Sequence, residues 1–354
     1  MTDPSTEYAW FGALCDDDYE LLGIPDPALR SSWEHCGDIV RTADRLGYDN
    51  VLLPSGYALG IDSVAFAAGI APQLAATRLL VAVRTGEVWP PQLARQLATL
   101  DRMLGGRLTV NIISSDLPGE TLASEPRYAR TLEVMQILRT LLDGAPIEHH
   151  GEFYDLEVAP PTARTVSDRC PPLYFGGLSE PARDVAAAAA DVYLMWPDTM
   201  PAVAAVLDDL RARAATHGRI LRFGYRVHVI VRETEREARA AAARLVSALD
   251  DGVGDTIRAR SLDHTSAGVH RQAELRSDAD DDGFVEEHLW TGIGRARSGC
   301  GAALVGDPDQ IRTKLDEYRA LGIGTFILSG YPHREEAEHF ARLVLDRDAT
   351  RRAR

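Results

Sequence analysis

Short apolar segments alternate with helical patterns along almost the whole chain, and this alternation restricts the possible folds more than any other feature. Eight segments are expected to be strands, at residues 8–14, 51–53, 79–84, 108–113, 173–175, 191–195, 223–231 and 325–328. Amphipathic patterns predict helices near residues 31–46, 62–75, 91–104, 127–143, 180–190, 199–217, 234–250, 307–321 and 334–347. This order predicts an α/β fold, a (β/α)8 TIM barrel. A doubly wound sheet is the alternative, but residues 11–19 lack the Gly-rich turn expected after its first strand.

We expect a single domain over residues 1–354, with two segments inserted into the alternation. Residues 145–171 hold clustered prolines and a short Glu-Phe-Tyr-Asp-Leu piece, which indicates a hairpin insertion. Residues 251–284 are polar and end in an acidic run, so a mobile lid-like insertion or a disordered segment is expected there. The acidic run has the spacing of a calcium loop, but its twelfth position is Leu289, where such a loop needs Glu. No metal site is predicted.

The predicted strand at residues 223–231 has two chemically different faces. One face is apolar, whereas the other carries Arg226 and His228. In a closed barrel the apolar face meets the helices, and Arg226 and His228 enter the lumen, where an anionic ligand could meet them. The alternative is an edge strand whose polar face is solvated.

The active site of a TIM barrel lies at the carboxyl ends of its strands. In this chain polar or unusual residues follow or end each predicted strand, in the order Cys15, Tyr57, Arg84, Asn111, Gly177, Trp196, His228 and Ser329. Gly177 and Ser179 could form only a turn with a helix N-cap, or could present N–H groups to a phosphate. Arg297 lies in a Gly-rich stretch and is either solvated or a ligand contact.

The composition argues against several classes of partner. A net charge of −15 disfavours binding to nucleic acid and to anionic membranes. The four cysteines are too dispersed to indicate a disulfide framework or a zinc site. Residues 1–7 show no signal peptide, and no apolar run approaches the roughly 20 residues that span a bilayer. A cytoplasmic protein is therefore expected.

Six runs of sequence together carry a resemblance to a known family: residues 43–48, 94–102, 171–177, 222–234, 301–306 and 328–333. They resemble the bacterial luciferase-like flavin monooxygenases, and more narrowly the two-component alkanesulfonate monooxygenases. The resemblance implies a TIM barrel that uses O2 and reduced FMN delivered by a separate NAD(P)H:flavin reductase. It further implies oxygenolytic cleavage of a small organosulfonate to an aldehyde and sulfite, by a homodimer or homotetramer.

The resemblance also implies roles for individual residues. His228, Arg226, Tyr331 and Arg297 would be catalytic, with Tyr331 as an acid/base group and Arg297 closing over the site. The residues implied to bind the cofactor are Asn111 at the isoalloxazine ring, Tyr128, Gly177 and Ser179 at the phosphate, and Ser329.

The chain departs from the sulfonate enzymes in the expected substrate pocket, for which we predict Cys15, Tyr57 and Trp196. Cys15 stands where those enzymes have a histidine, and Tyr57 where they have an arginine. A larger or less charged substrate is therefore plausible. The alternatives are a hydroxylase or Baeyer–Villiger-type monooxygenase acting on a secondary metabolite, an F420-dependent oxidoreductase, and a non-catalytic flavin-binding barrel.

Overall fold

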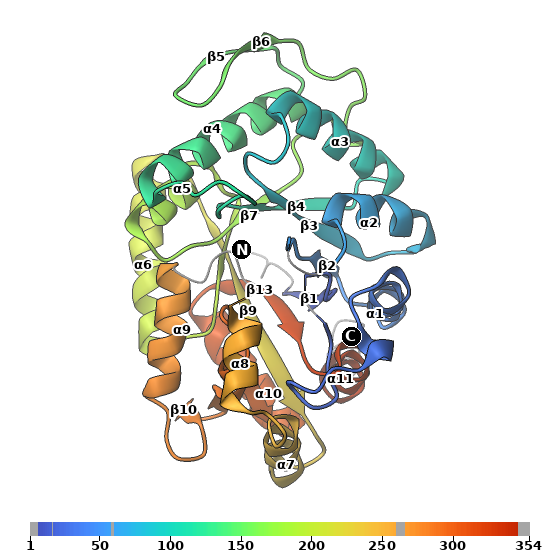
Figure 1. Cartoon of the computed structure of the whole chain (residues 1–354). Helices are drawn as coiled ribbons and strands as arrows, with labels where there is room; N and C mark the ends of the chain where they lie inside the picture. The colour runs from blue at the N-terminus through green and yellow to red at the C-terminus, as the bar shows by residue number, and fades with distance from the viewer. Residues whose placement is uncertain (1–5, 16, 58–59, 260–265, 346–354) are drawn as a thin grey trace.

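Eight parallel strands close into a barrel at the centre of the molecule (Figure 1). The computed structural model describes residues 6–15, 17–57, 60–259 and 266–345. Around the ring the strands are β1 Glu7–Phe11, β2 Asn50–Leu53, β3 Arg78–Arg84, β4 Leu108–Ile113, β7 Leu173–Phe175, β8 Val192–Met195, β9 Arg222–Val231 and β13 Ile323–Ser329. Pairing of β13 with β1 closes the ring. The predicted TIM barrel is confirmed.

Helices surround the barrel, as Figure 1 shows. They are α1 Trp33–Arg45, α2 Ser63–Ile70, α3 Pro90–Met103, α4 Ser124–Leu142, α5 Glu180–Ala189, α6 Met200–Thr216, α7 Glu235–Leu245, α10 Pro308–Ala320 and α11 His333–Phe340. Local sequence determines where α7 and α10 begin. Thr234 forms a capping box with Glu237 at the start of α7, and Asp307 forms one with Gln310 at the start of α10. No helix within the described ranges is both long and apolar enough to cross a bilayer.

The main core lies between the strands and the helices. Trp10 on β1 is fully buried, and its ring centroid lies 5.2 Å from that of Tyr48. Tyr225, on the outer face of β9, donates a 3.0 Å hydrogen bond to Tyr318 on α10. Burial of such large side chains contributes roughly 1.5–3 kcal/mol each. The outer face of β9 therefore anchors the strand and leaves the other face for the lumen.

The structure contains strands that the sequence did not predict. The last four residues of β9 pair in parallel with β12 Ala303–Gly306, which extends through β11 Leu289–Trp290 to β10 Phe284–Glu286. The strand β12 is only four residues long and follows a Gly-rich stretch, so its pattern is weak. Its position beside His228 brings the segment that precedes it against the active end of the barrel.

The two predicted insertions differ in structure. The antiparallel strands β5 Ile147–His150 and β6 Asp155–Val158 form a hairpin outside the helices, at the top of Figure 1. The second segment contains α8 Asp251–Arg258 and α9 Ala267–Ser277, so the disordered alternative is wrong for these residues. The α9 helix carries no apolar stripe for sequence reasoning to find, and α8 is only eight residues long. Residues 260–265, in the middle of the predicted lid, lie outside the described residues.

Candidate active site

A pocket at the carboxyl ends of β4, β7, β8 and β9 collects six of the residues singled out from the sequence. They are Asn111, Tyr128, Gly177, Ser179, Trp196 and Arg226. The start of α9 also lines this pocket, through Ser266, Ala267 and Gly268. Residues from distant parts of the sequence therefore meet at the end of the barrel where such active sites are built.

One end of this pocket is suited to an anionic group. Ser179 is the N-cap residue of α5, but its side chain makes no capping hydrogen bond. The hydroxyls of Ser179 and Ser114 are both buried and have no hydrogen-bond partner within the described part of the chain. A Cβ at Gly177 would lie 2.6 Å from that of Ala182 and 3.3 Å from the Tyr128 hydroxyl oxygen. Free hydroxyls and helix N–H groups at a site that only glycine fits favour a phosphate over plain capping.

Arg226 supplies a buried positive charge to the same pocket. Its side chain is 5% exposed and lies over the Phe11 ring, with its guanidinium carbon 4.4 Å from the ring centroid. It donates a 3.2 Å hydrogen bond to the Val227 carbonyl and pairs with no carboxylate among the residues the structure describes. An uncompensated buried cation is costly, so this position favours an anionic ligand.

His228 is held as a neutral imidazole. Its Nε2 lies 3.2 Å from the Cys300 carbonyl oxygen, which can only accept, so Nε2 carries the proton. Its Nδ1, 2.6 Å from Ser329 Oγ, then accepts a hydrogen bond from that hydroxyl. Burial, the Arg226 charge and His333 together hold the pKa of His228 well below its usual value. Both ring nitrogens are thus occupied by the protein, and the ring stacks on Tyr331 at a centroid distance of 5.4 Å.

Tyr331 keeps its phenolic proton at neutral pH. Burial raises the pKa of its hydroxyl to about 12, with Asp18 adding to the rise and Arg297 opposing it. The side chain is 6% exposed. It is therefore a hydrogen-bond donor or proton donor rather than a phenolate.

Arg297 hydrogen-bonds to the thiol of Cys15 and lies near Tyr331. Burial raises the pKa of Cys15, although the Arg297 and Arg226 charges oppose the rise, so the thiol stays protonated. Arg297 thus lies against Cys15 and Tyr331, two other residues that were predicted for the site. Cys15 acts as a neutral partner that positions this guanidinium.

A buried cluster of one carboxylate and two histidines beneath Tyr331 was missed from the sequence. Asp18 Oδ1 lies 2.8 Å from His333 Nδ1, and Asp18 Oδ2 lies 3.0 Å from His35 Nε2. Burial raises the pKa of Asp18, but the two histidines outweigh this effect and the net pKa is lowered. His333 meets the Tyr331 ring edge-on at 4.9 Å. The only sequence signal was that His333 closes the resembling run at residues 328–333.

Three further predicted residues, Tyr57, Ser329 and Trp196, lie in three different environments. Tyr57 is 70% exposed and lines none of the described pockets, so the structure does not bring it to the predicted substrate pocket. Ser329 lies at His228 and not in the pocket with Ser179. Trp196 lines that pocket and is flanked by two glycines, since a Cβ at Gly268 or Gly299 would come within 3.0 Å of the indole.

Comparisons with known proteins identify the family of this chain. Residues 21–325 match the family described as luciferase-like monooxygenase. A sulfoquinovose monooxygenase of Novosphingobium aromaticivorans is 63% identical over 352 residues, covering 98% of this chain and 97% of the relative. A sulfoquinovose monooxygenase of Agrobacterium fabrum is 53% identical over 343 residues, covering 96% of this chain and 89% of the relative.

A solved structure shows the same fold at low sequence identity. The EDTA monooxygenase of Chelativorans matches with a TM-score of 0.78 at 17% identity, over 98% of this chain and 94% of that chain. The family match covers more than half of the chain and the relatives cover nearly all of it. The chain belongs to the luciferase-like monooxygenase family and is an enzyme of that type.

Proposed function

We propose that this enzyme is the oxygenase of a two-component system that uses reduced FMN and O2 to convert an organosulfonate, sulfoquinovose, into an aldehyde and sulfite. The observation that carries this proposal is the identity of 63% and 53% to two relatives named sulfoquinovose monooxygenase. A separate NAD(P)H:flavin reductase supplies the reduced FMN. The single domain acts in the cytoplasm as a homodimer or homotetramer.

Features of the pocket support the proposed binding of FMN. The unpartnered hydroxyls of Ser179 and Ser114, together with Tyr128 and the start of α5, would hold the phosphate. Asn111 would contact the isoalloxazine ring. When bound, reduced FMN supplies the electrons that activate oxygen, and the protein supplies orientation, charge and a dry site.

The arginines give the site its preference for a sulfonate. Arg226 brings an uncompensated charge to the pocket, and Arg297 reaches the site from the opposite segment. A guanidinium can hold a sulfonate through two parallel hydrogen bonds and keeps its charge at any working pH. Cys15 is uncharged, and Tyr57 points to solvent, which supports a substrate larger than a simple alkanesulfonate.

The reaction also needs control of protons. Overall, one sulfonate, one O2 and one reduced FMN give the aldehyde, the sulfite dianion, water, oxidised FMN and one proton. The electrons of the broken C–S bond leave with sulfite, and the proton passes to solvent. Tyr331 holds a proton on its hydroxyl that it can lend to a developing oxyanion. His228 is fixed as a neutral ring against Tyr331, so we assign it to orienting that hydroxyl.

The test is to mix the purified enzyme anaerobically with reduced FMN, admit oxygen, and measure absorbance and sulfite with sulfoquinovose or octanesulfonate. We expect sulfite with sulfoquinovose and much less with octanesulfonate. Sulfite from neither sulfonate would contradict the proposed reaction. Failure to bind reduced FMN would favour the F420-dependent alternative.

A further inference from the structure

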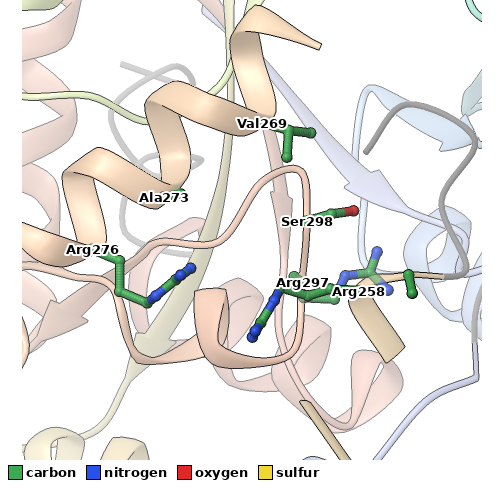
Figure 2. A pocket seen from close by; sticks show the side chains of 7 residues that line it. Arg258, Val269, Ala273, Arg276, Arg297 and Ser298 are labelled. Atoms are coloured by element: carbon green, nitrogen blue, oxygen red, sulfur yellow. The ribbon is translucent and has the colours of Figure 1, made fainter. Parts of the chain in front are cut away.

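A second cavity, of about 170 Å3, lies beside the pocket described above (Figure 2). One wall is the face of α9 that carries Val269, Ala273 and Arg276. The opposite wall is formed by Arg258 at the end of α8 and by Arg297 and Ser298, which follow the short helix η3 Gly292–Arg295. Figure 2 shows the α9 side chains on one side of the gap and those of the other two segments facing them.

At Arg276 this cavity carries a positive charge that no carboxylate within the described ranges pairs with. Arg258 pairs with Asp255 and donates to the Arg295 carbonyl. Arg276 donates a 2.8 Å hydrogen bond to the Gly294 carbonyl and pairs with no carboxylate in the described ranges. Burial lowers the pKa of Arg276, and the charge of Arg258 lowers it further, with Asp255 opposing only in part. In a chain with a net charge of −15, such a local excess points to an anion.

The cavity shares its wall with the active site. Arg297 lines the cavity and also hydrogen-bonds to Cys15 near Tyr331. Gly299, two residues further on, packs against Trp196 in the main pocket. The segment 297–299 therefore contributes to the walls of both spaces.

We propose that this cavity is a second binding site, for a sulfur oxyanion: the sulfonate group of an arriving substrate or the sulfite that leaves. The proposal rests on the proposed function, which determines which oxyanions the enzyme meets. Guanidinium groups bind such oxygens with good geometry, and the Ser298 hydroxyl adds a further donor. Arg297 lines this cavity and also contacts Cys15, so an ion bound here would share a guanidinium with the active site.

The first test is chemical labelling of arginines in the flavin-free protein. Phenylglyoxal modification of Arg258 and Arg276 is followed by peptide mass spectrometry while sulfite, methanesulfonate or chloride is added at constant ionic strength. We expect saturable protection by a sulfur oxyanion but not by chloride. Arg244, whose side chain is 64% exposed on α7, is the internal control and should be unaffected. Protection by sulfite alone identifies a product site, by methanesulfonate alone a substrate site, and by both a shared site.

The second test separates direct binding from an indirect effect of the main pocket. In Arg276→Gln the protection of Arg258 should need about tenfold more ion, because a charged hydrogen bond is lost. In Arg276→Lys, which keeps the positive charge, most of the affinity for the ion should remain. No protection in the wild type, equal protection by chloride, or an unchanged midpoint in Arg276→Gln overturns the proposal. Sulfite release from sulfoquinovose is measured in parallel: turnover without protection refutes this site alone, whereas protection without turnover refutes the proposed function alone.

Discussion

At the scale of single residues, His228 has a more restricted role than its position in the sequence suggests. The Cys300 carbonyl and Ser329 occupy its two ring nitrogens. The sequence placed His228 correctly on the lumen face of a strand, because side-chain alternation is a local property. Its hydrogen-bond partners lie 72 and 101 residues away, so no local pattern could show that it lacks a free nitrogen.

We predict that His228 stays neutral across pH 5–8. Its pKa in the folded protein is lowered by burial and by Arg226, so the ring gains a proton only on unfolding. Its contribution to stability is therefore complete above the unfolded pKa of about 6.5 and decreases as the pH falls below it. In NMR spectra, the ring 15N chemical shifts of His228 should stay constant between pH 5 and 8. His150, paired with Asp155 and Glu148, has a raised pKa and should titrate in the same spectra. A midpoint for His228 above pH 6 would contradict this assignment.

Asp18 leads to a second prediction. The fully buried carboxylate accepts from His333 and His35, so Asp18→Asn should lower the free energy of unfolding at pH 7 by about 3 kcal/mol. Its pKa is lowered in the folded protein, so this contribution is present above the unfolded pKa of about 3.9 and is lost as the pH falls through the folded pKa. Urea unfolding should show the difference between wild type and variant shrinking below about pH 4.

The control for Asp18 is Asp38→Asn, which removes a half-exposed partner of Arg41. Surface pairs of this kind contribute about 0–1 kcal/mol, so this variant should unfold almost as the wild type does. Equal decreases in the free energy of unfolding of the two variants would show that the buried cluster stabilises the fold no more than a surface pair does.

At the scale of whole elements, α9 is the segment whose docking forms part of the pocket wall. Arg271 pairs with Asp198 through two contacts of 2.7 and 2.8 Å, and Gln272 donates a 2.6 Å hydrogen bond to the Pro197 carbonyl. These contacts hold Gly268 against Trp196. The sequence predicted a lid in this region but not a helix, since polar helices are stabilised by caps and distant contacts rather than by an apolar stripe.

We predict that Arg271→Gln loosens α9 without unfolding the barrel. Amide hydrogen exchange in residues 267–277 should become about tenfold faster, because a charge-assisted pair is lost, while exchange in β9 stays unchanged. Water would then reach the site more easily, so more hydrogen peroxide should form per aldehyde released. Arg334→Gln, which removes an exposed pair with Glu335, is the matched control. Unchanged exchange in α9 would exclude the Arg271 pair as its anchor.

At the scale of the whole molecule, the barrel was the part most readily predicted. Its strands are buried apolar runs separated by amphipathic helices, which is a pattern that survives without knowledge of any contact. The strand β12 was missed because four residues after a Gly-rich stretch carry too little pattern. The end of the pocket at Gly177 and Ser179 could be located from the sequence because it depends on one local turn, whereas the cluster at Asp18 joins residues 315 positions apart.

The same architecture predicts how the protein unfolds. Because β13 pairs with β1, the first and last strands complete one ring, and removing either leaves open edges on both neighbours. We therefore expect a single urea transition, with circular dichroism and tryptophan fluorescence coinciding. Trp10 on β1 and Trp290 on β11 report on the barrel and on its extension. To test for a single transition, we would compare the urea unfolding curves of Trp10→Phe and Trp290→Phe. Measuring each curve at two protein concentrations separates unfolding from the dissociation of any oligomer. An earlier midpoint in the variant that keeps Trp290 would show that the extension from β10 to β12 unfolds as a separate unit.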